Sequence, residues 1–167
     1  MAPYDIRIFG DPVLKTPTTD VTNIDGTVAA LAKDMLTTMY EAPGIGLAAP
    51  QVGVQKRMFV YDIGDGAGPH TVINPVLTAP AGEWTYDEGC LSVPGLYWPI
   101  ERAKTVHLTG LDLDGNALDI EADDLLARMF QHECDHLDGV LLLERLTKDQ
   151  RKEAMRELRR RSEMETS

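Results

Sequence analysis

Two histidines at helical spacing carry the clearest chemical signal in the sequence. They stand in the segment His132-Glu133-Cys134-Asp135-His136. On a helix this spacing places both imidazoles on one face, about one turn apart, so that both can bind one cation. Glu133 is turned by about 100° from His132, which puts its carboxylate at the edge of that face. A metal ion makes a bound water acidic, and a carboxylate in this position can take the proton.

The same motif also occurs on helices whose histidines lie at the surface and pair with acidic side chains. The neighbouring residues argue against this alternative, because Leu125 and Met129 share the face of the histidines. An adjacent apolar stripe runs through Leu126, Phe130, Cys134 and Leu137. We therefore expect two buried faces, and buried histidines need a polar partner such as a metal ion. Cys134 is turned by roughly 200° from either histidine, so we expect it to pack in the core.

A catalytic metal site usually has three protein ligands and one open position. The candidates for the third ligand are Cys90, His70, His107 and many carboxylates. Cys90 follows Gly89, and a glycine permits a close backbone approach or an unusual dihedral angle. A lone cysteine is also often a small core residue, so the residues by themselves leave the third ligand open.

A glycine-rich segment, Gly44-Ile45-Gly46-Leu47-Ala48-Ala49-Pro50-Gln51, ends in an amide side chain. Small residues allow the backbone of a ligand to lie against the protein backbone. The segment does not fit a phosphate-binding loop, because no Lys-Ser or Lys-Thr pair follows it. Taken alone, the segment is better explained as a tight packing turn.

The elements that must position these residues follow from the hydrophobic periodicity. Residues 27–40 and 124–137 have helical spacing. The segment Thr147-Lys148-Asp149-Gln150 fits a capping box that begins a last helix. Four segments rich in β-branched or aromatic residues are typical of strands: 57–63, 70–77, 104–113 and 117–122.

This order of elements predicts an α+β fold rather than alternating βαβ units. We expect mainly antiparallel sheets packed around a central HExxH helix, with an N-terminal helix and a C-terminal helix. The chain has 167 residues, which suits one compact domain. We therefore expect a single catalytic domain over 1–167, in which 146–167 form the C-terminal helix and tail.

Composition limits the location and the partners. The sequence has no apolar run long enough to span a bilayer, and its N-terminus lacks a basic start followed by an apolar stretch. We therefore expect a cytoplasmic protein without membrane contact. The net charge of -11 argues against a general binder of nucleic acids, so DNA is not an expected partner.

Three segments in this order resemble the signature motifs of the peptide deformylase family: GIGLAAPQ at 44–51, EGCLS at 88–92 and QHECDH at 131–136. The resemblance extends from about Gly10 to about Leu146. It implies a metal-dependent hydrolase that removes the formyl group from the N-terminal formyl-methionine of newly synthesised polypeptides and releases formate. It also implies one divalent metal ion, Fe(II) as the native one, with Zn, Ni or Co as possible substitutes.

The resemblance assigns roles to single residues. It implies that the metal ligands are Cys90, His132 and His136, that Glu133 is the general acid/base, and that oxyanion stabilisation comes from Gln51 and the backbone N–H of Leu91. We expect the peptide to lie extended near Gly46 and Gly89, with the methionine side chain in a pocket formed by Leu125, Met129 and Ile45. Many bacterial members carry an arginine shortly after EGCLS, whereas Tyr97 stands at the equivalent position here.

Two other functions use parts of the same pattern. A zinc peptidase also has HExxH, but such enzymes typically use His or Glu as the third ligand, where this chain offers Cys90. A structural metal site in a binding module is closed by four protein ligands. No fourth ligand stands at a suggestive spacing in the sequence.

The predicted C-terminal helix has a charge opposite to that of the rest of the chain. Residues 148–161 contain seven basic and three acidic residues, a net charge of +4, whereas the remaining residues carry -15. Cations near a helix C-terminus favour the macrodipole, and i to i+4 ion pairs support helices, so a structural explanation exists. The functional hypothesis is that this helix docks on ribosomal RNA near the exit of the nascent chain.

Overall fold

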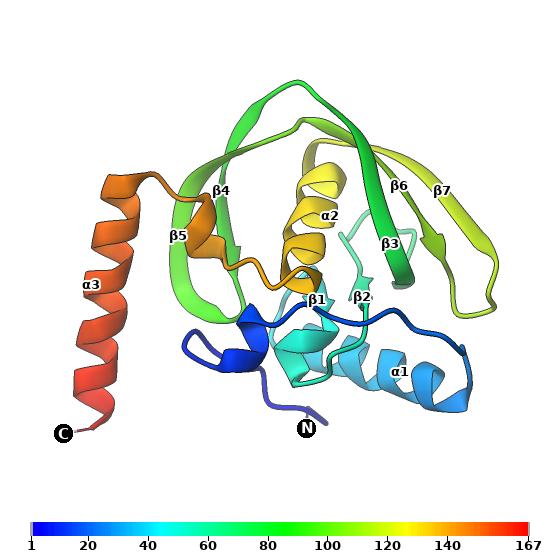
Figure 1. Ribbon diagram of the computed structural model, residues 1–167, viewed down its shortest axis with the longest axis horizontal. Coiled ribbons are helices and arrows are strands. Elements are labelled where there is room, and N and C mark those ends of the chain that lie inside the picture. Colours follow the sequence, from blue (N-terminus) through cyan, green and yellow to red (C-terminus); the bar gives the residue numbers. More distant parts are fainter. Residues whose placement is uncertain (1, 167) are drawn as a thin grey trace.

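The computed structural model describes residues 2–166 (Figure 1). Its helices are α1 (Gly26–Glu41), α2 (Asp124–Leu137) and α3 (Lys148–Glu165). Its strands are β1 (Gly46–Ala48), β2 (Met58–Tyr61), β3 (His70–Ala81), β4 (Trp84–Cys90), β5 (Val93–Arg102), β6 (Thr105–Leu111) and β7 (Ala117–Asp123). Short 3₁₀ turns lie at Pro12–Lys15, Ala49–Val52 and Leu142–Arg145.

The strands form two separate antiparallel units. One is a five-stranded sheet with the order β1-β2-β3-β6-β7, and the other is the β4–β5 hairpin. Helix α2 lies between the hairpin and the five-stranded sheet (Figure 1). The predicted α+β class, with antiparallel sheets around the HExxH helix, is therefore confirmed.

Helix α1 begins where the sequence predicts a helix. The side chain of Asp25 accepts hydrogen bonds from the backbone N–H groups of Thr27 and Val28, which satisfies the first free donors of the helix. Its apolar face is buried against β1 and β2 through four side chains: Val28, Leu31, Met35 and Met39. This packing fixes the position of the glycine-rich segment that follows the helix.

The four predicted strands are confirmed with shifted ends, but the prediction missed β1, β4 and β5. Strand β1 is short and small in composition, so it has no strand signal of its own. In the β4–β5 hairpin the charged side chains of Glu88 and Arg102 are buried, while Tyr86 and Tyr97 are exposed. This reverses the usual alternation of apolar inside and polar outside, on which the prediction of strands depends.

Helix α2 uses two faces for different purposes. Phe130, Cys134 and Leu137 pack into an apolar cluster with side chains of β2 and β6. Burial raises the pKa of the Cys134 thiol to about 12, so this side chain is a neutral core residue. The histidines of the helix face the β4–β5 hairpin instead.

Helix α3 starts with the predicted capping box. The hydroxyl oxygen of Thr147 accepts from the N–H of Gln150, and the side-chain oxygen of Gln150 accepts from the N–H of Thr147. Ala154 and Leu158 pack on the apolar cluster formed with β5, so α3 lies along the outer side of the hairpin (Figure 1). Within residues 2–166, no helix combines the length and the apolar character needed to cross a membrane.

Candidate active site

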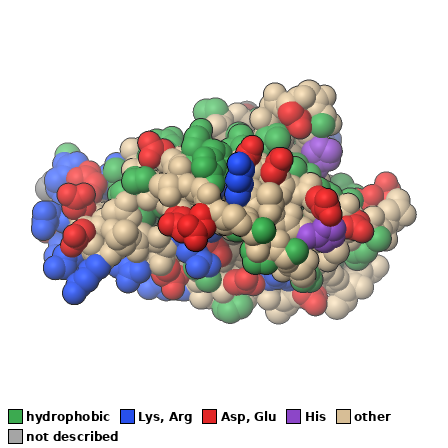
Figure 2. All heavy atoms as spheres, turned by 90° about the horizontal axis from the view of Figure 1, so that it is seen from above, with side chains coloured by type: hydrophobic (Ala, Val, Ile, Leu, Met, Phe, Trp, Pro, Cys, Tyr) green, Lys and Arg blue, Asp and Glu red, His purple; other side chains and the backbone are tan. Residues whose placement is uncertain are grey.

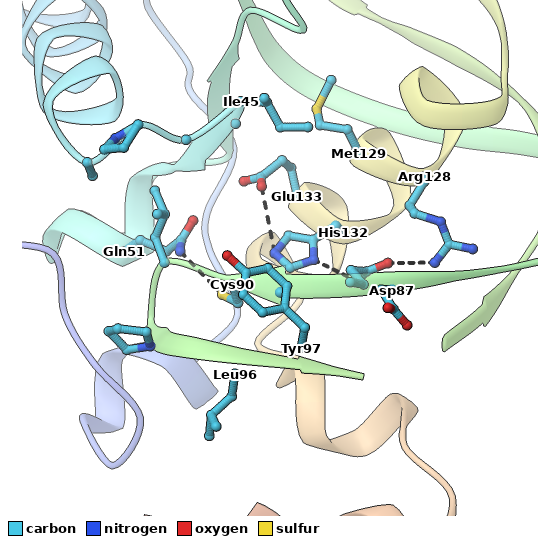
Figure 3. Close-up of a pocket in the computed structure, with 18 of the residues that line it drawn as sticks. Ile45, Gln51, Asp87, Cys90, Leu96, Tyr97, Arg128, Met129, His132 and Glu133 are labelled. Carbon is cyan, nitrogen blue, oxygen red and sulfur yellow. Dashed lines mark hydrogen bonds and ion pairs between the residues drawn. The ribbon is translucent and has the colours of Figure 1, made fainter. Parts of the chain in front are cut away.

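A cavity of about 570 Å³ lies between α2, the β4–β5 hairpin and the segment that follows α1. Cys90, His132 and Glu133 line it together with Gln51, as Figure 3 shows. The three signature segments of the sequence, which are far apart along the chain, therefore meet at one cavity.

Three atoms that could bind a metal ion converge at this site. The Sγ of Cys90 lies 3.3 Å from Nε2 of His136, which lies 3.2 Å from Nε2 of His132. In a tetrahedral site with ligand bonds of about 2.0–2.3 Å, neighbouring donor atoms are expected roughly 3.3–3.6 Å apart. The donor set of one sulfur and two imidazole nitrogens therefore fits a divalent transition-metal ion. Among residues 2–166 this is the one such group of three found.

His132 is oriented by a buried carboxylate. Its Nδ1 lies 2.8 Å from Oε2 of Glu88, so the proton on Nδ1 leaves the lone pair of Nε2 free for a metal. Burial by itself raises the pKa of Glu88, but hydrogen bonds from His132 and Arg102 outweigh it and lower the pKa well below its usual range. Glu88 is therefore an ionised acceptor that fixes the ring of His132.

Glu88 is part of a larger chain of buried charges. Arg102 donates to both of its oxygens at 2.8 and 2.7 Å, and Arg128 donates to Oε1 at 2.8 Å. Arg102 also donates to Asp135, which in turn accepts two hydrogen bonds from Arg145. We call the series His132, Glu88, Arg102, Asp135 and Arg145 the charge chain. Sequence reasoning missed it, because its members come from four elements and no local spacing links all of them.

The electrostatics of Cys90 suit a metal ligand. Burial alone raises the pKa of its thiol, but the neighbouring His136 and His132 outweigh burial and lower the pKa well below the usual range. A thiolate is the form of cysteine that binds metal ions. His70 and His107, the other imidazole candidates, lie elsewhere: His70 stacks on Tyr61, and His107 pairs with Asp119.

Glu133 lies beside Cys90, His132 and His136, and one of its carboxylate oxygens has no hydrogen-bond partner among the described residues. Its Oε1 is 3.9 Å from Nε2 of His132, and its Oε2 is buried without a hydrogen-bond partner in the described part of the chain. Burial raises the pKa of Glu133. Gly46 leaves room for this carboxylate, because a Cβ there would lie only 3.1 Å from Oε1. The carboxylate is thus placed to accept a proton at the site.

Gln51 is held by its carbonyl end. Its Oε1 accepts from the backbone N–H of Ala48 at 3.0 Å, which fixes the amide within the 3₁₀ turn. Its Nε2 donates to the hydroxyl of Ser92 at 3.1 Å and faces Sγ of Cys90 at 3.7 Å. The donor end is therefore aimed at the ligand group. Ser92 ends the EGCLS segment but had no role predicted for it, and its hydroxyl completes this arrangement.

The residues expected to contact substrate line the same cavity: Ile45, Gly46, Gly89, Leu91, Leu125 and Met129. Ile45 and Met129 lie side by side next to Glu133 (Figure 3). Met129 and Leu125 come from α2, about one turn and two turns before His132, respectively. Leu91 packs against Gly44. The cavity thus has an apolar part directly next to the ligand group.

An α+β fold with a buried Cys-His-His group, an adjacent carboxylate and an apolar cavity defines a metal-dependent hydrolase. The family model for polypeptide deformylase matches residues 3–152. The chain belongs to the polypeptide deformylase family. It is therefore a hydrolase that removes the formyl group from the N-terminal methionine of newly synthesised polypeptides and releases formate.

Individual relatives agree with this assignment. The chain is 52% identical to a peptide deformylase of Acidothermus cellulolyticus over 95% of this chain and 87% of the relative. Among solved structures, a peptide deformylase from Legionella pneumophila is similar with a TM-score of 0.90 and 38% identity, covering 98% of this chain and 97% of that one. A peptide deformylase from Synechococcus elongatus in complex with actinonin also has a TM-score of 0.90 and is 41% identical, covering 94% of this chain and 88% of that one. The alternatives of a zinc peptidase and a structural metal site are thereby set aside.

Proposed function

We propose that Cys90, His132 and His136 hold a divalent metal ion and that Glu133 moves the protons of the deformylation reaction. The observation that carries this proposal is the convergence of one sulfur and two nitrogens 3.2 and 3.3 Å apart, next to a carboxylate with a free oxygen. We further propose that 1–167 form one catalytic domain, with 146–167 as its C-terminal helix and tail.

The chemistry divides between the ion and the chain. When bound, a divalent ion lowers the pKa of water and polarises a carbonyl oxygen. Glu133 takes a proton from the attacking water, and the resulting hydroxide adds to the formyl carbon. Glu133 then gives this proton to the departing amine, which leaves formate and a free N-terminal methionine. Burial raises the pKa of Glu133, which makes its carboxylate a better proton acceptor.

Negative charge develops on the formyl oxygen during the attack. We propose that the Nε2 amide of Gln51 and the backbone N–H of Leu91 stabilise it. Gln51 is suited to this role because Ala48 and Ser92 hold its amide, so that no reorganisation is needed during the reaction. Leu91 is suited because it directly follows the ligand Cys90.

The substrate backbone has two strand edges available to it. Strand β1 pairs only with β2, and β4 pairs only with β5, within the sheets of the described chain. The carbonyl of Ile45 accepts from Asp62 of the segment after β2, so the peptide groups of the next residue, Gly46, point to the open edge. We propose that an extended peptide is added between Gly46 and Gly89.

The methionine side chain then enters the apolar part of the cavity. We propose Leu125 and Met129 as one wall and Ile45 as the other, on the ground that all three line the cavity beside Glu133. A pocket of this kind distinguishes substrates by about 1–3 kcal/mol per methylene group.

We propose Fe(II) as the native ion, with Zn, Ni and Co as functional substitutes. An iron centre beside the Cys90 thiolate is open to oxidation at both metal and sulfur. We therefore expect the Fe(II) form to lose activity in air faster than the Ni form. The measurement is formate release from a formyl-methionyl peptide over time, after metal analysis of protein purified without oxygen. Equal half-lives of the iron and nickel forms, or protein purified with another metal, would contradict the proposal.

We also propose that the enzyme works in the cytoplasm on nascent chains and that α3 docks on ribosomal RNA. Lys and Arg side chains gather over the end of the molecule that α3 forms (Figure 2). Lys152, Arg156 and Arg159 are exposed on this helix. We expect reversal of these three charges to glutamate to abolish co-sedimentation with ribosomes at low salt. Because the binding rests on phosphate contacts, the unmodified protein should dissociate steeply as salt increases.

A matched control separates the helix from net charge. Lys15, Lys33 and Lys104 are exposed elsewhere, and their reversal changes the net charge by the same amount. This control should still co-sediment, and both variants should keep their activity on small formyl-peptides. Equal loss of binding in the two variants, or no binding of the unmodified protein at low salt, would contradict the role of α3.

A further inference from the structure

Tyr97 is exposed, but packing against the neighbouring strand holds its side chain in place. Its side chain is 68% exposed, yet it stands directly opposite Gly89 in the β4–β5 hairpin. A Cβ on Gly89 would lie 2.5 Å from Cε1 of Tyr97, so the ring occupies the space where a side chain of β4 would be. The Cδ1 and Cε1 atoms of the ring therefore lie against the backbone of the strand that borders the cavity, next to Cys90 (Figure 3). An aromatic ring over a cross-strand glycine is held in place by that contact.

The two faces of β4 have different surroundings. The side chain of Glu88 points to α2, where it meets His132, and the alternate residues of a strand point to opposite faces. Gly89 is therefore on the other face, and Tyr97, which pairs with it, is on that face as well. The methionine pocket lies on the α2 side, since Leu125 and Met129 belong to α2.

These faces determine where a bound peptide places its side chains. The proposed function puts the formyl group at Cys90 and Leu91 and the methionine side chain on the α2 side. In an extended peptide the next side chain points the opposite way. It then lies on the face of Tyr97, at the level of Gly89.

We infer that Tyr97 determines the preference for the residue that follows methionine, and that its ring favours an aromatic side chain there. The inference rests on the proposed function only for the direction of the peptide. Most of the ring is exposed and available for contact, while its Cδ1 and Cε1 atoms are already packed on Gly89. Little freedom is therefore lost when a substrate ring contacts it.

The test compares two substrates within each enzyme variant. The substrates are formyl-Met-Phe and formyl-Met-Ala peptides with the same remaining sequence, and the readout is the ratio of their kcat/KM values. We expect the metal-loaded enzyme to prefer the phenylalanine peptide roughly two- to tenfold, the range that corresponds to one aromatic contact. The ratio should fall to about one in Tyr97→Ala and remain in Tyr97→Phe, because the ring and not the hydroxyl makes the contact.

The ratio separates this inference from the rest of the mechanism. A general disturbance of the hairpin in Tyr97→Ala lowers both kcat/KM values and leaves their ratio unchanged. Tyr40→Ala serves as a control, because Tyr40 is an exposed tyrosine that bonds to Asp62 outside the cavity. A ratio near one in the unmodified enzyme, or the same ratio in Tyr97→Ala, would overturn the inference. Failure to cleave either peptide would instead contradict the proposed catalytic roles.

Discussion

Replacement of Glu133 by alanine is expected to abolish nearly all deformylase activity while the protein keeps its metal. The carboxylate is the one group beside the ligands with a free oxygen among the described residues, and general acid/base catalysis contributes about 10²–10⁴-fold to rates. Since Glu133 is not a ligand in the proposed site, the metal content should stay that of the unmodified protein. The measurements are formate release and elemental analysis of the same preparation.

Stability gives an independent check on this role. The buried Oε2 of Glu133 makes no hydrogen bond in the described chain, and a buried polar group without a partner does not stabilise a fold. The midpoint of thermal unfolding should therefore not fall in Glu133→Ala. A variant that purified without metal would refute the assignment of Glu133 as a residue that only moves protons.

The two cysteines should respond to the same substitution in opposite ways. Cys90→Ser is expected to lose most of its metal affinity and its activity, because a hydroxyl does not replace a thiolate as a ligand for a transition-metal ion. Cys134→Ser should retain both, since Cys134 packs in the apolar cluster on the other side of α2. The free energy of unfolding of Cys134→Ser should instead fall by about 1–3 kcal/mol, because the substitution buries a hydroxyl without a hydrogen-bond partner.

Metal titration of the two apo proteins, together with denaturant unfolding, measures both effects. Each serine variant is the control for the other, because the chemical change is identical and only the position differs. Equal loss of metal in both variants would contradict the ligand set of Cys90, His132 and His136.

Local patterns in the sequence account for the parts of the fold that could be predicted. Helices α1 and α2 were found by their hydrophobic periodicity and α3 by its capping box, because each of these patterns lies within a short stretch of the chain. The β4–β5 hairpin was not found, because its buried residues are charged. Arg102 donates a hydrogen bond to Glu88 across the hairpin, so the two buried charges compensate each other. No pattern within either strand predicts an ion pair between residues 14 positions apart.

Some residues of the candidate site could likewise be predicted from local patterns, whereas others could not. The pair His132 and His136 and the position of Glu133 follow from helical geometry alone. Cys90 lies 46 residues before His136, so the residues by themselves left it among several candidates, and the family resemblance supplied it. Glu88 and Ser92, which orient His132 and Gln51, were missed because they act through contacts that only the tertiary structure creates.

The charge chain has a consequence for the order in which the enzyme is assembled. His132 is held by Glu88, and Glu88 by Arg102, without any contribution from an ion. The conformational entropy of the His132 side chain is thus lost when the chain folds, so it does not reduce the free energy of metal binding. In this respect the site differs from a zinc finger, whose ligands become ordered only around the metal. We therefore expect the metal site to be formed by folding alone, so that ions bind and exchange without the chain having to refold.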